Sequence, residues 1–223
     1  MTDAMPNTMT NAKQREQICL LAKSMFDRGL TAGASGNISV RCADGSLLVT
    51  PTGACFGRLD PGQLSHISAA GQHLSGDAPT KEMPLHSAFY ESRQNTGAVV
   101  HLHSTHSVAL SMITPADDDK PFLPPLTAYS VMRLGKVELL PYFRPGDPAM
   151  GDAVRSLAGK RSAVMLASHG PVVAGLELEA AVYAIEELEE TAKLCLLLRG
   201  MKPTMLSDAQ IRDLATHYKI EWD

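Results

Sequence analysis

Residues 31–59 read TAGASGNISVRCADGSLLVTPTGACFGRL, and they contain the clearest hairpin pattern of the chain. Apolar and polar residues alternate over 38–42, as in a strand with one buried face. Asp44-Gly45 follows and readily supplies the positive φ of a tight turn, after which the apolar segment 47–50 returns. We therefore predict two antiparallel neighbouring strands here, which excludes a purely parallel sheet.

Outside this hairpin, helical and extended patterns alternate along the chain. Predicted helices cover 11–29, 81–93, 105–112, 178–199 and 207–218, and another helix starts at Asp147-Pro148. Predicted strands cover 99–103, 137–142, 164–167 and 172–175, and a weaker hairpin covers 66–76. The Pro- and Asp-rich segment 114–128 is predicted to be a long loop. This order predicts an α/β sandwich with a mixed, largely antiparallel sheet.

The length of 223 residues is that of one ordinary domain. Because the chain shows no internal repeat and no linker, we predict a single domain over residues 11–223. Residues 1–10 are polar and Met-rich, and we predict a mobile tail there. They have neither a basic start nor an apolar run, which is unlike a signal peptide, so we expect a cytoplasmic protein.

The composition argues against several classes of function. The 20 Lys and Arg are outnumbered by 24 Asp and Glu, so nucleic-acid binding gets no support. A membrane-spanning helix needs about 18 or more consecutive apolar residues, and no stretch approaches that length, so we expect no membrane partner. The four cysteines form no C-x-x-C pair, which predicts buried, reduced thiols. Eight histidines remain as the unusual feature.

Three of these histidines are candidate metal ligands. On a strand with a period of two, the imidazoles of His101 and His103 point to the same face. Alone, an H-x-H pair is a weak signal, and two ordinary polar residues at a strand end are the more common case. His169-Gly170, at the end of another apolar strand, adds a third donor. Three histidines leave a coordination position open, which is the pattern of a catalytic rather than a structural zinc site.

The remaining histidines are weaker candidates. His106 is close in sequence to the pair, but its direction on the following helix is not fixed. The other four are predicted to be surface or structural residues: His66, His73, His86 and His217. Among them, His86 lies four residues after Glu82 and shares its helix face, so we expect it to support the site without binding metal.

Glu82 is the candidate acid, at the start of the predicted helix 81–93. A glutamate in a first turn also complements the helix dipole, so a purely structural role stays open. Glu187, Glu189 and Glu190 lie together in the long helix 178–199, and we predict that they form a solvated face.

Five motifs in order carry a family resemblance: GN-x-S, T-P-T-G, P-x-x-E, H-x-H and H-G. Together they resemble the class II aldolase/adducin family from about Gly33 to Gly200. Within the family, segments such as DAPTKE and PYFRPGDPAMGDAV look most like the branch that decarboxylates 3-oxo-tetronate 4-phosphates. The resemblance implies a three-layer α/β/α fold and a cyclic homotetramer.

The same resemblance implies roles for individual residues. Zinc would bind His101, His103 and His169, with Mn²⁺ or Co²⁺ not distinguished by these ligands. Glu82 would act as acid and base and as a further contact to the metal. Phosphate contacts carry over to Asn37, Thr52, Gly53 and Thr80. Tyr129 and Tyr218 are candidates for residues that a neighbouring subunit supplies.

The chain departs from the aldolases at one position of this set. The aldolases have Ser-Ser before their glutamate, whereas this chain has Thr80-Lys81. Lys81 is a compact cation that could pair with the substrate's phosphate or carboxylate, or it could be an ordinary exposed lysine at a helix start. The departure puts an aldolase's sugar specificity in doubt.

The activity that follows is metal-dependent decarboxylation of a phosphorylated small molecule, 3-oxo-tetronate 4-phosphate, to dihydroxyacetone phosphate and CO₂ through an enediolate. A fuculose-phosphate-type aldolase or a ribulose-phosphate 4-epimerase is the alternative within the family. A non-catalytic adducin-like module, which would not need the metal ligands, and a metal-dependent hydrolase are the alternatives from other classes.

Overall fold

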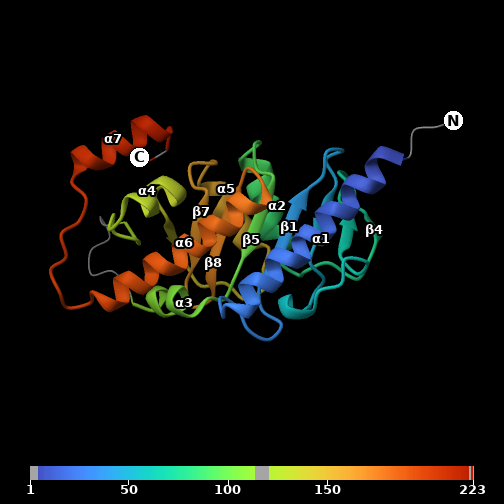
Figure 1. Cartoon of the computed structure of the whole chain (residues 1–223), viewed down its shortest axis with the longest axis horizontal. Coiled ribbons are helices and arrows are strands. Elements are labelled where there is room, and N and C mark those ends of the chain that lie inside the picture. The colour runs from blue at the N-terminus through green and yellow to red at the C-terminus, as the bar shows by residue number, and fades with distance from the viewer. Residues whose placement is uncertain (1–4, 114–120, 221, 223) are drawn as a thin grey trace.

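The computed structural model describes residues 5–113, 121–220 and Trp222 (Figure 1). Its α-helices are α1 Met5–Asp27, α2 Met83–Ser92, α3 Thr105–Ser111, α4 Ala128–Leu134, α5 Ala149–Ser156, α6 Leu178–Leu197 and α7 Asp208–Tyr218. Its strands are β1 Asn37–Arg41, β2 Leu47–Val49, β3 Ser65–Ile67, β4 His73–Ser75, β5 Ala98–His101, β6 Glu138–Leu140, β7 Ala163–Leu166 and β8 Gly170–Gly175. A 3₁₀ turn covers Phe56–Arg58.

The strands form one sheet of eight in the order β4-β3-β2-β1-β5-β8-β7-β6. Every neighbouring pair in this order is antiparallel except β6 and β7, which are parallel. Both predicted hairpins are present, as β1–β2 and β3–β4. The prediction of a mixed, largely antiparallel sheet is confirmed.

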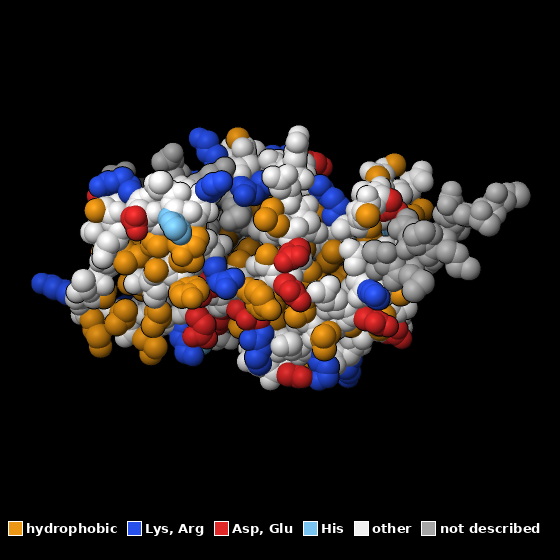
Figure 2. Space-filling view, turned by 45° about the horizontal axis from the view of Figure 1, so that its top comes forward, with side chains coloured by type: hydrophobic (Ala, Val, Ile, Leu, Met, Phe, Trp, Pro, Cys, Tyr) orange, Lys and Arg blue, Asp and Glu red, His pale blue; other side chains and the backbone are white. Residues whose placement is uncertain are grey.

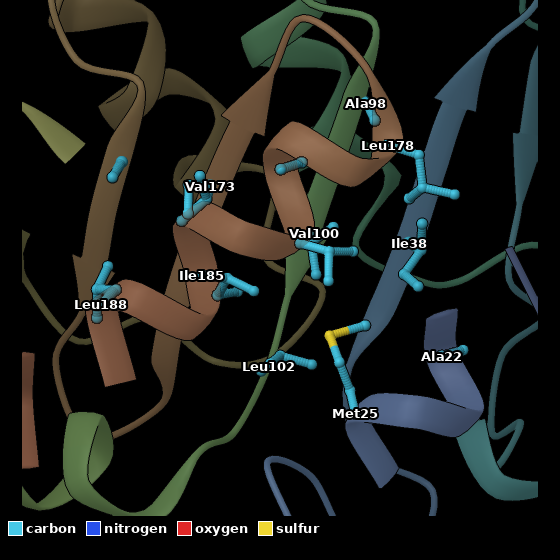
Figure 3. Packing of buried hydrophobic residues seen from close by; sticks show 14 of the residues in the cluster. Ala22, Met25, Ile38, Ala98, Val100, Leu102, Val173, Leu178, Ile185 and Leu188 are labelled. Carbon is cyan, nitrogen blue, oxygen red and sulfur yellow. The ribbon is translucent and has the colours of Figure 1, made fainter. Parts of the chain in front are cut away.

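Helices cover both faces of this sheet, which gives the three layers. On one face, side chains of α1 and α6 pack against alternate residues of β1, β5 and β8, such as Ile38, Val100 and Val173 (Figure 3). On the other face, α2 and α5 pack against the intervening residues, such as Val99 and Val172. The alternation assigns each strand residue to one face, and it places β5 residue His101 on the α2 side.

Several element boundaries differ from the sequence-based expectation. Helix α1 begins at Met5, whereas we expected a start at Asn11; residues 1–4 of the expected tail lie outside the described residues. Residues 114–120 of the expected loop also lie outside them. Helix α4 was not expected, although Thr127 caps it by accepting a hydrogen bond from the Ser130 backbone at 3.0 Å. The Pro-rich sequence before Thr127 hid this helix start.

Of the described helices, none is both long and apolar enough to cross a membrane. The four cysteines are all free thiols. Burial raises the pKa of Cys19 and of Cys195 to about 11, as is usual for structural thiols in apolar surroundings.

Candidate active site

The three predicted metal ligands meet at one end of the sheet. His101 ends β5, and His103 follows two residues later, beyond the end of the strand. His169 lies in the three-residue turn that joins β7 to β8. Since β5 and β8 are antiparallel neighbours with His101 opposite Val172, the end of β5 and the start of β8 lie at the same end of the sheet. The expectation that His103 also lies on the strand was wrong, but its ring still turns toward the other two.

Two glycines let the backbone pack closely around these histidines. A Cβ atom on Gly170 would lie 2.1 Å from the carbonyl oxygen of Leu102, the residue between the first two histidines. A Cβ on Gly36, whose φ is +85°, would lie 2.9 Å from the carbonyl oxygen of His101. The H-G and G-N motifs therefore have a steric reason, because only glycine allows both approaches.

The three imidazole rings form a compact triangle. Their centroids are 4.8 Å apart for His101 and His103, 4.8 Å for His101 and His169, and 4.7 Å for His103 and His169. One ligand nitrogen from each ring lies within 4.8 Å of the others. His101 and His169 are buried, whereas His103 is partly exposed. The triangle is therefore open to a substrate on the His103 side.

The electrostatics of the triangle favour neutral imidazoles. Burial, followed by the proximity of His103 and His169, lowers the pKa of His101 well below its ordinary value. Burial also lowers the pKa of His103 and of His169. The backbone carbonyl of Pro171 lies 2.8 Å from His101 Nδ1 and accepts its hydrogen, so that Nε2 keeps its lone pair. Neutral rings with free lone pairs are the form that binds a metal.

Glu82 lies beside the triangle. It occupies the N-cap position of α2, but its side chain makes no capping hydrogen bond. Instead, Oε2 lies 3.4 Å from His101 Nε2, and Oε1 lies 3.4 Å from His169 Nε2. The carboxylate is buried, and Asn37 Nδ2 donates a hydrogen bond of 2.7 Å to Oε2. The alternative of a simple dipole-complementing glutamate does not explain this inward direction.

These residues fit a divalent cation. Glu82 Oε1 and both ring nitrogens of His169 are buried and have no hydrogen-bond partner among the described residues. Unpartnered buried polar atoms are costly, and two of these, Glu82 Oε1 and His169 Nε2, lie 3.4 Å apart beside the His101 ring. Three imidazoles with one carboxylate nearby are a typical donor set for zinc in a catalytic site.

Three of the predicted phosphate-binding residues, Thr52, Gly53 and Thr80, lie on two neighbouring loops, whereas Asn37 is the first residue of β1. The backbone of Thr52 donates to Ala78 O at 2.9 Å, and that of Thr80 donates to Thr50 O at 3.2 Å, which holds the loops together. Thr52 and Gly53 are exposed, and a Cβ on Gly53 would meet no atom within 4 Å. The loops therefore leave room for a ligand, while a phosphate contact by any of these residues stays a prediction.

The residues that flank Glu82 differ in exposure. Thr80 is buried, and its hydroxyl accepts a hydrogen bond of 3.3 Å from the Glu82 backbone. Lys81 is exposed, and none of the described carboxylates lies within ion-pair distance of its ammonium group. The side chain of Asn37 holds Glu82 with one of the two hydrogens on Nδ2, so the second is left for a ligand.

The two predicted tyrosines lie away from the histidines of their own chain. Tyr218 lines a cavity of about 700 Å³, which lies at the opposite end of β8, around Gly175. The exposed Tyr129 packs its ring against Arg133, another residue of that cavity. The candidate metal ligands lie away from this cavity, and a contribution of either tyrosine to a neighbouring subunit stays a prediction.

The expectation of a solvated face for the glutamates of α6 was wrong for Glu189. Glu189 is buried, and its carboxylate accepts hydrogen bonds from the backbone nitrogens of His106 and Ser107, both at 2.9 Å. Its oxygens are also 2.8 Å from His106 Nδ1 and 2.6 Å from Ser107 Oγ. Glu189 thereby anchors the start of α3, directly after the H-x-H motif. His106 contacts Glu189, so its position is explained without a role as a metal ligand.

The sequence did not indicate two further buried residues behind Glu82, Ser39 and Tyr90. Ser39 Oγ lies 2.7 Å from His86 Nδ1 and 2.9 Å from the Tyr90 hydroxyl, and all three residues are buried. Burial, followed by the proximity of His101, lowers the pKa of His86 to about 3, so this ring is neutral. His86 is therefore buried, with both ring nitrogens hydrogen-bonded to Ser39 and Asn37, and its supporting role stays a prediction.

The fold and the histidine triangle together define an α/β protein with a candidate metal centre at the ends of two central strands. A model of the class II aldolase and adducin N-terminal domain matches residues 16–196. The chain belongs to the class II aldolase and adducin family, as the resemblance predicted.

Three relatives place the chain within the family. It is 46% identical over 200 residues to the 3-oxo-tetronate 4-phosphate decarboxylase of Escherichia coli (strain K12), covering 90% of this chain and 94% of the relative. It is 30% identical to the L-fuculose phosphate aldolase of the same strain, over 95% of this chain and 96% of the relative. The crystal structure of YgbL from Escherichia coli aligns with a TM-score of 0.88 at 44% identity, covering 92% of this chain and 99% of that one.

Proposed function

We propose that this protein is a metal-dependent decarboxylase that converts 3-oxo-tetronate 4-phosphate to dihydroxyacetone phosphate and CO₂. The observation that carries the proposal is the placement of the buried Glu82 carboxylate between Asn37 and the histidine triangle. The identity of 46% to a decarboxylase of that name, against 30% to an aldolase, supports the choice of substrate.

The chemistry needs an electron sink and a proton donor. A divalent ion held by His101, His103 and His169 would supply a Lewis acid for the negative charge that develops on the substrate oxygens. When the C1–C2 bond breaks, CO₂ leaves and its electron pair moves into the C2–C3 system, which becomes an enediolate. Glu82 then delivers a proton to C2, which completes dihydroxyacetone phosphate. Asn37 fixes the carboxyl group for that transfer, because a proton must cross within hydrogen-bond reach.

An aldolase of this family passes through the same enediolate and releases an aldehyde in place of CO₂. The two activities therefore share the histidines and Glu82, and they differ in the leaving fragment. An adducin-like module without catalysis would have no need for three converging histidines, so their triangle argues against it. A hydrolase would leave the glycine-containing loops beside Glu82 unexplained.

The deciding experiment is incubation of the purified protein with 3-oxo-tetronate 4-phosphate. We expect dihydroxyacetone phosphate and CO₂ in equal amounts, and loss of both after removal of metal with a chelator. Release of an aldehyde from L-fuculose 1-phosphate, without CO₂ release from the first substrate, would replace the decarboxylase with an aldolase. Absence of both activities in the metal-loaded protein would contradict the proposal.

We further propose zinc as the resident metal, one ion per subunit, in a cytoplasmic homotetramer. Three neutral imidazoles suit zinc, and the free cysteines suit a reducing compartment. Exposed apolar side chains gather at the left-hand end of the molecule (Figure 2), and the exposed large residues of α6 and the segment after it include Leu197, Met201 and Met205. Such a surface supports assembly with other copies, which light scattering would measure.

A further inference from the structure

A continuous chain of buried polar side chains connects Glu82 to the far end of α2. The Tyr90 hydroxyl lies 2.9 Å from Ser39 Oγ, which lies 2.7 Å from His86 Nδ1. His86 Nε2 lies 2.5 Å from Asn37 Oδ1, and Asn37 Nδ2 lies 2.7 Å from Glu82 Oε2. All five residues are less than 10% exposed, which makes this chain a sealed network behind the candidate active site.

The network forms because the spacing of side chains along α2 matches the spacing of side chains along β1. Glu82, His86 and Tyr90 are spaced by four residues along α2, so they form one stripe with a rise of about 6 Å per step. Asn37 and Ser39 are two residues apart on β1, so they share one face with a rise of about 6.6 Å. The helix stripe lies along the strand, and each helix residue therefore finds a strand partner.

The donors and acceptors of the network have one consistent direction. The Glu82 carboxylate accepts from the Asn37 amide nitrogen, so Asn37 Oδ1 must accept from His86 Nε2–H. The neutral imidazole then has a lone pair on Nδ1, which accepts from the Ser39 hydroxyl. The Tyr90 hydroxyl in turn donates to Ser39. Each hydrogen bond fixes the orientation of the next group, and the last one fixes the Asn37 amide toward Glu82.

We infer that this network, with His86 at its centre, positions the carboxylate of Glu82 for proton transfer. The inference rests on the proposed function, because it gives the network a role in the step that Glu82 performs. The two carboxylate oxygens are treated unequally: Oε2 is held by Asn37, whereas Oε1 has no hydrogen-bond partner in the described structure and faces His169. The network thus holds one oxygen in place and leaves the other for chemistry.

His86 acts here as a positioning residue, since its imidazole is hydrogen-bonded to Asn37 and Ser39 and not to the Glu82 carboxylate. An unanchored Asn37 amide could rotate and present its oxygen to the carboxylate, which would push the carboxylate away. A displacement of about 1 Å at a reacting group can cost about 100-fold in rate. A network that only filled space could be replaced by an apolar side chain without this loss.

The test replaces His86 in the full-length, metal-loaded enzyme. We expect His86→Phe to lower kcat by about 10- to 100-fold, with KM and bound metal unchanged within about twofold. His86→Gln keeps an N–H donor for Asn37 and should recover part of that loss. Phe89→Leu is the matched control, because Phe89 is an equally buried residue of α2 with no polar group, and its kcat should stay at the wild-type value.

Ser39→Ala and Tyr90→Phe provide a second route if His86→Phe does not fold. They remove one hydroxyl each from the distant part of the network, and we expect kcat to fall by about 3- to 10-fold for Ser39→Ala and by less for Tyr90→Phe. The inference is overturned if the folded, metal-loaded His86→Phe enzyme has the wild-type kcat. If that variant does not fold, a wild-type kcat in the Ser39→Ala enzyme overturns it.

A readout independent of turnover separates this inference from the proposed function. In ¹⁵N-labelled holoenzyme, the side-chain amide signal of Asn37, assigned by its loss in Asn37→Ser, should shift in His86→Phe and Ser39→Ala and stay in place in Phe89→Leu. An unmoved Asn37 signal in the His86 and Ser39 variants overturns the network's role, whatever the substrate. If the Asn37 signal shifts in these variants but the wild-type enzyme does not decarboxylate the substrate, only the proposed function is contradicted.

Discussion

Asn37 and His101 are direct partners across the antiparallel β1–β5 ladder. The side chain of one holds the Glu82 carboxylate, and the imidazole of the other forms one corner of the histidine triangle. Because paired residues on one sheet face lie about 5 Å apart, the ladder holds Asn37, and through its hydrogen bond the Glu82 carboxylate, beside His101. One pair of strands therefore connects the candidate acid to one corner of the candidate metal centre, and this connection motivates the predictions below.

His169→Ala should abolish stable metal binding. The variant removes one of three converging imidazoles, and the remaining two bind a divalent ion only weakly. We expect about one metal ion per wild-type subunit by elemental analysis, and less than about a tenth of that in the variant. Added zinc should raise the melting temperature of the wild type, since a ligand that binds only the folded state stabilises it.

His73→Ala is the control for this prediction. His73 is an exposed histidine of β4, at the edge of the sheet and outside the triangle. Its loss should leave both the metal content and the zinc-dependent rise in melting temperature unchanged. A metal content that is equal in the His169 and His73 variants would mean that the triangle is not the binding site.

Glu82→Gln should retain the metal and lose most of the activity. The amide is nearly the same size as the carboxyl group, but it can neither give nor take the proton at C2. We expect kcat to fall by about 10²- to 10⁴-fold, in line with the usual contribution of a general acid or base. The variant should also stop the exchange of dihydroxyacetone phosphate hydrogens with deuterium from D₂O, which is the reverse of the proposed protonation step. Exchange at the wild-type rate would remove Glu82 from the mechanism.

The architecture was predictable where a local pattern carried it. The Asp44-Gly45 turn and the alternation over 38–42 predicted the β1–β2 hairpin, and Ser207 predicted the start of α7 through its capping hydrogen bonds. Helix α4 was not predictable in this way, because four prolines close to its start favour a loop when read locally. Its single cap at Thr127 and its packing beside α6 stabilise it in the folded chain.

For the candidate site, the sequence predicted the candidate ligands and one candidate support, His86, but not the other supports. His101 and His103 are identifiable from their spacing, and His169 from the glycine that follows it. Glu189 was misread because its hydrogen-bond donors lie more than 80 residues earlier in the chain, at His106 and Ser107. No local periodicity encodes which strand a helix stripe will face, and long-range partners of this kind become visible only in the folded structure.

Lys81→Ala tests whether the cation beside Glu82 contacts substrate. Lys81 is exposed, directly precedes the buried Glu82, and has no carboxylate partner in the described residues, so its charge is available to an anion. We expect KM for 3-oxo-tetronate 4-phosphate to rise about tenfold or more, as for the loss of a charge-assisted hydrogen bond. Lys81→Arg should preserve most of the affinity, and Lys160→Ala, a distant lysine, should change nothing. Unaltered kcat and KM in Lys81→Ala would identify it as an ordinary surface lysine.

Glu189→Gln should destabilise the fold at neutral pH. The carboxylate accepts four hydrogen bonds at the start of α3, and an amide would point an N–H group at two of these donors. Hydrogen bonds to a charged group contribute about 1.5–3 kcal/mol each, so we expect the free energy of unfolding to fall by about 2–3 kcal/mol in urea denaturation. Glu190→Gln is the control, because the Glu190 side chain is 63% exposed on the same helix, and its effect should stay within about 0.5 kcal/mol.

The destabilisation by Glu189→Gln should also depend on pH with a defined sign. Burial raises the pKa of Glu189, but the hydrogen bonds from Ser107 and His106 outweigh it and hold the pKa below its ordinary value of 4.5. In the window between 4.5 and that lower value, the unfolded state binds more protons than the folded state. The wild-type advantage is therefore complete above pH 4.5 and shrinks as the pH falls through the folded-state pKa. Unfolding curves of the two proteins measured between neutral and acidic pH should converge, and a gap that stays constant over this range would contradict an ionised Glu189 at the start of α3.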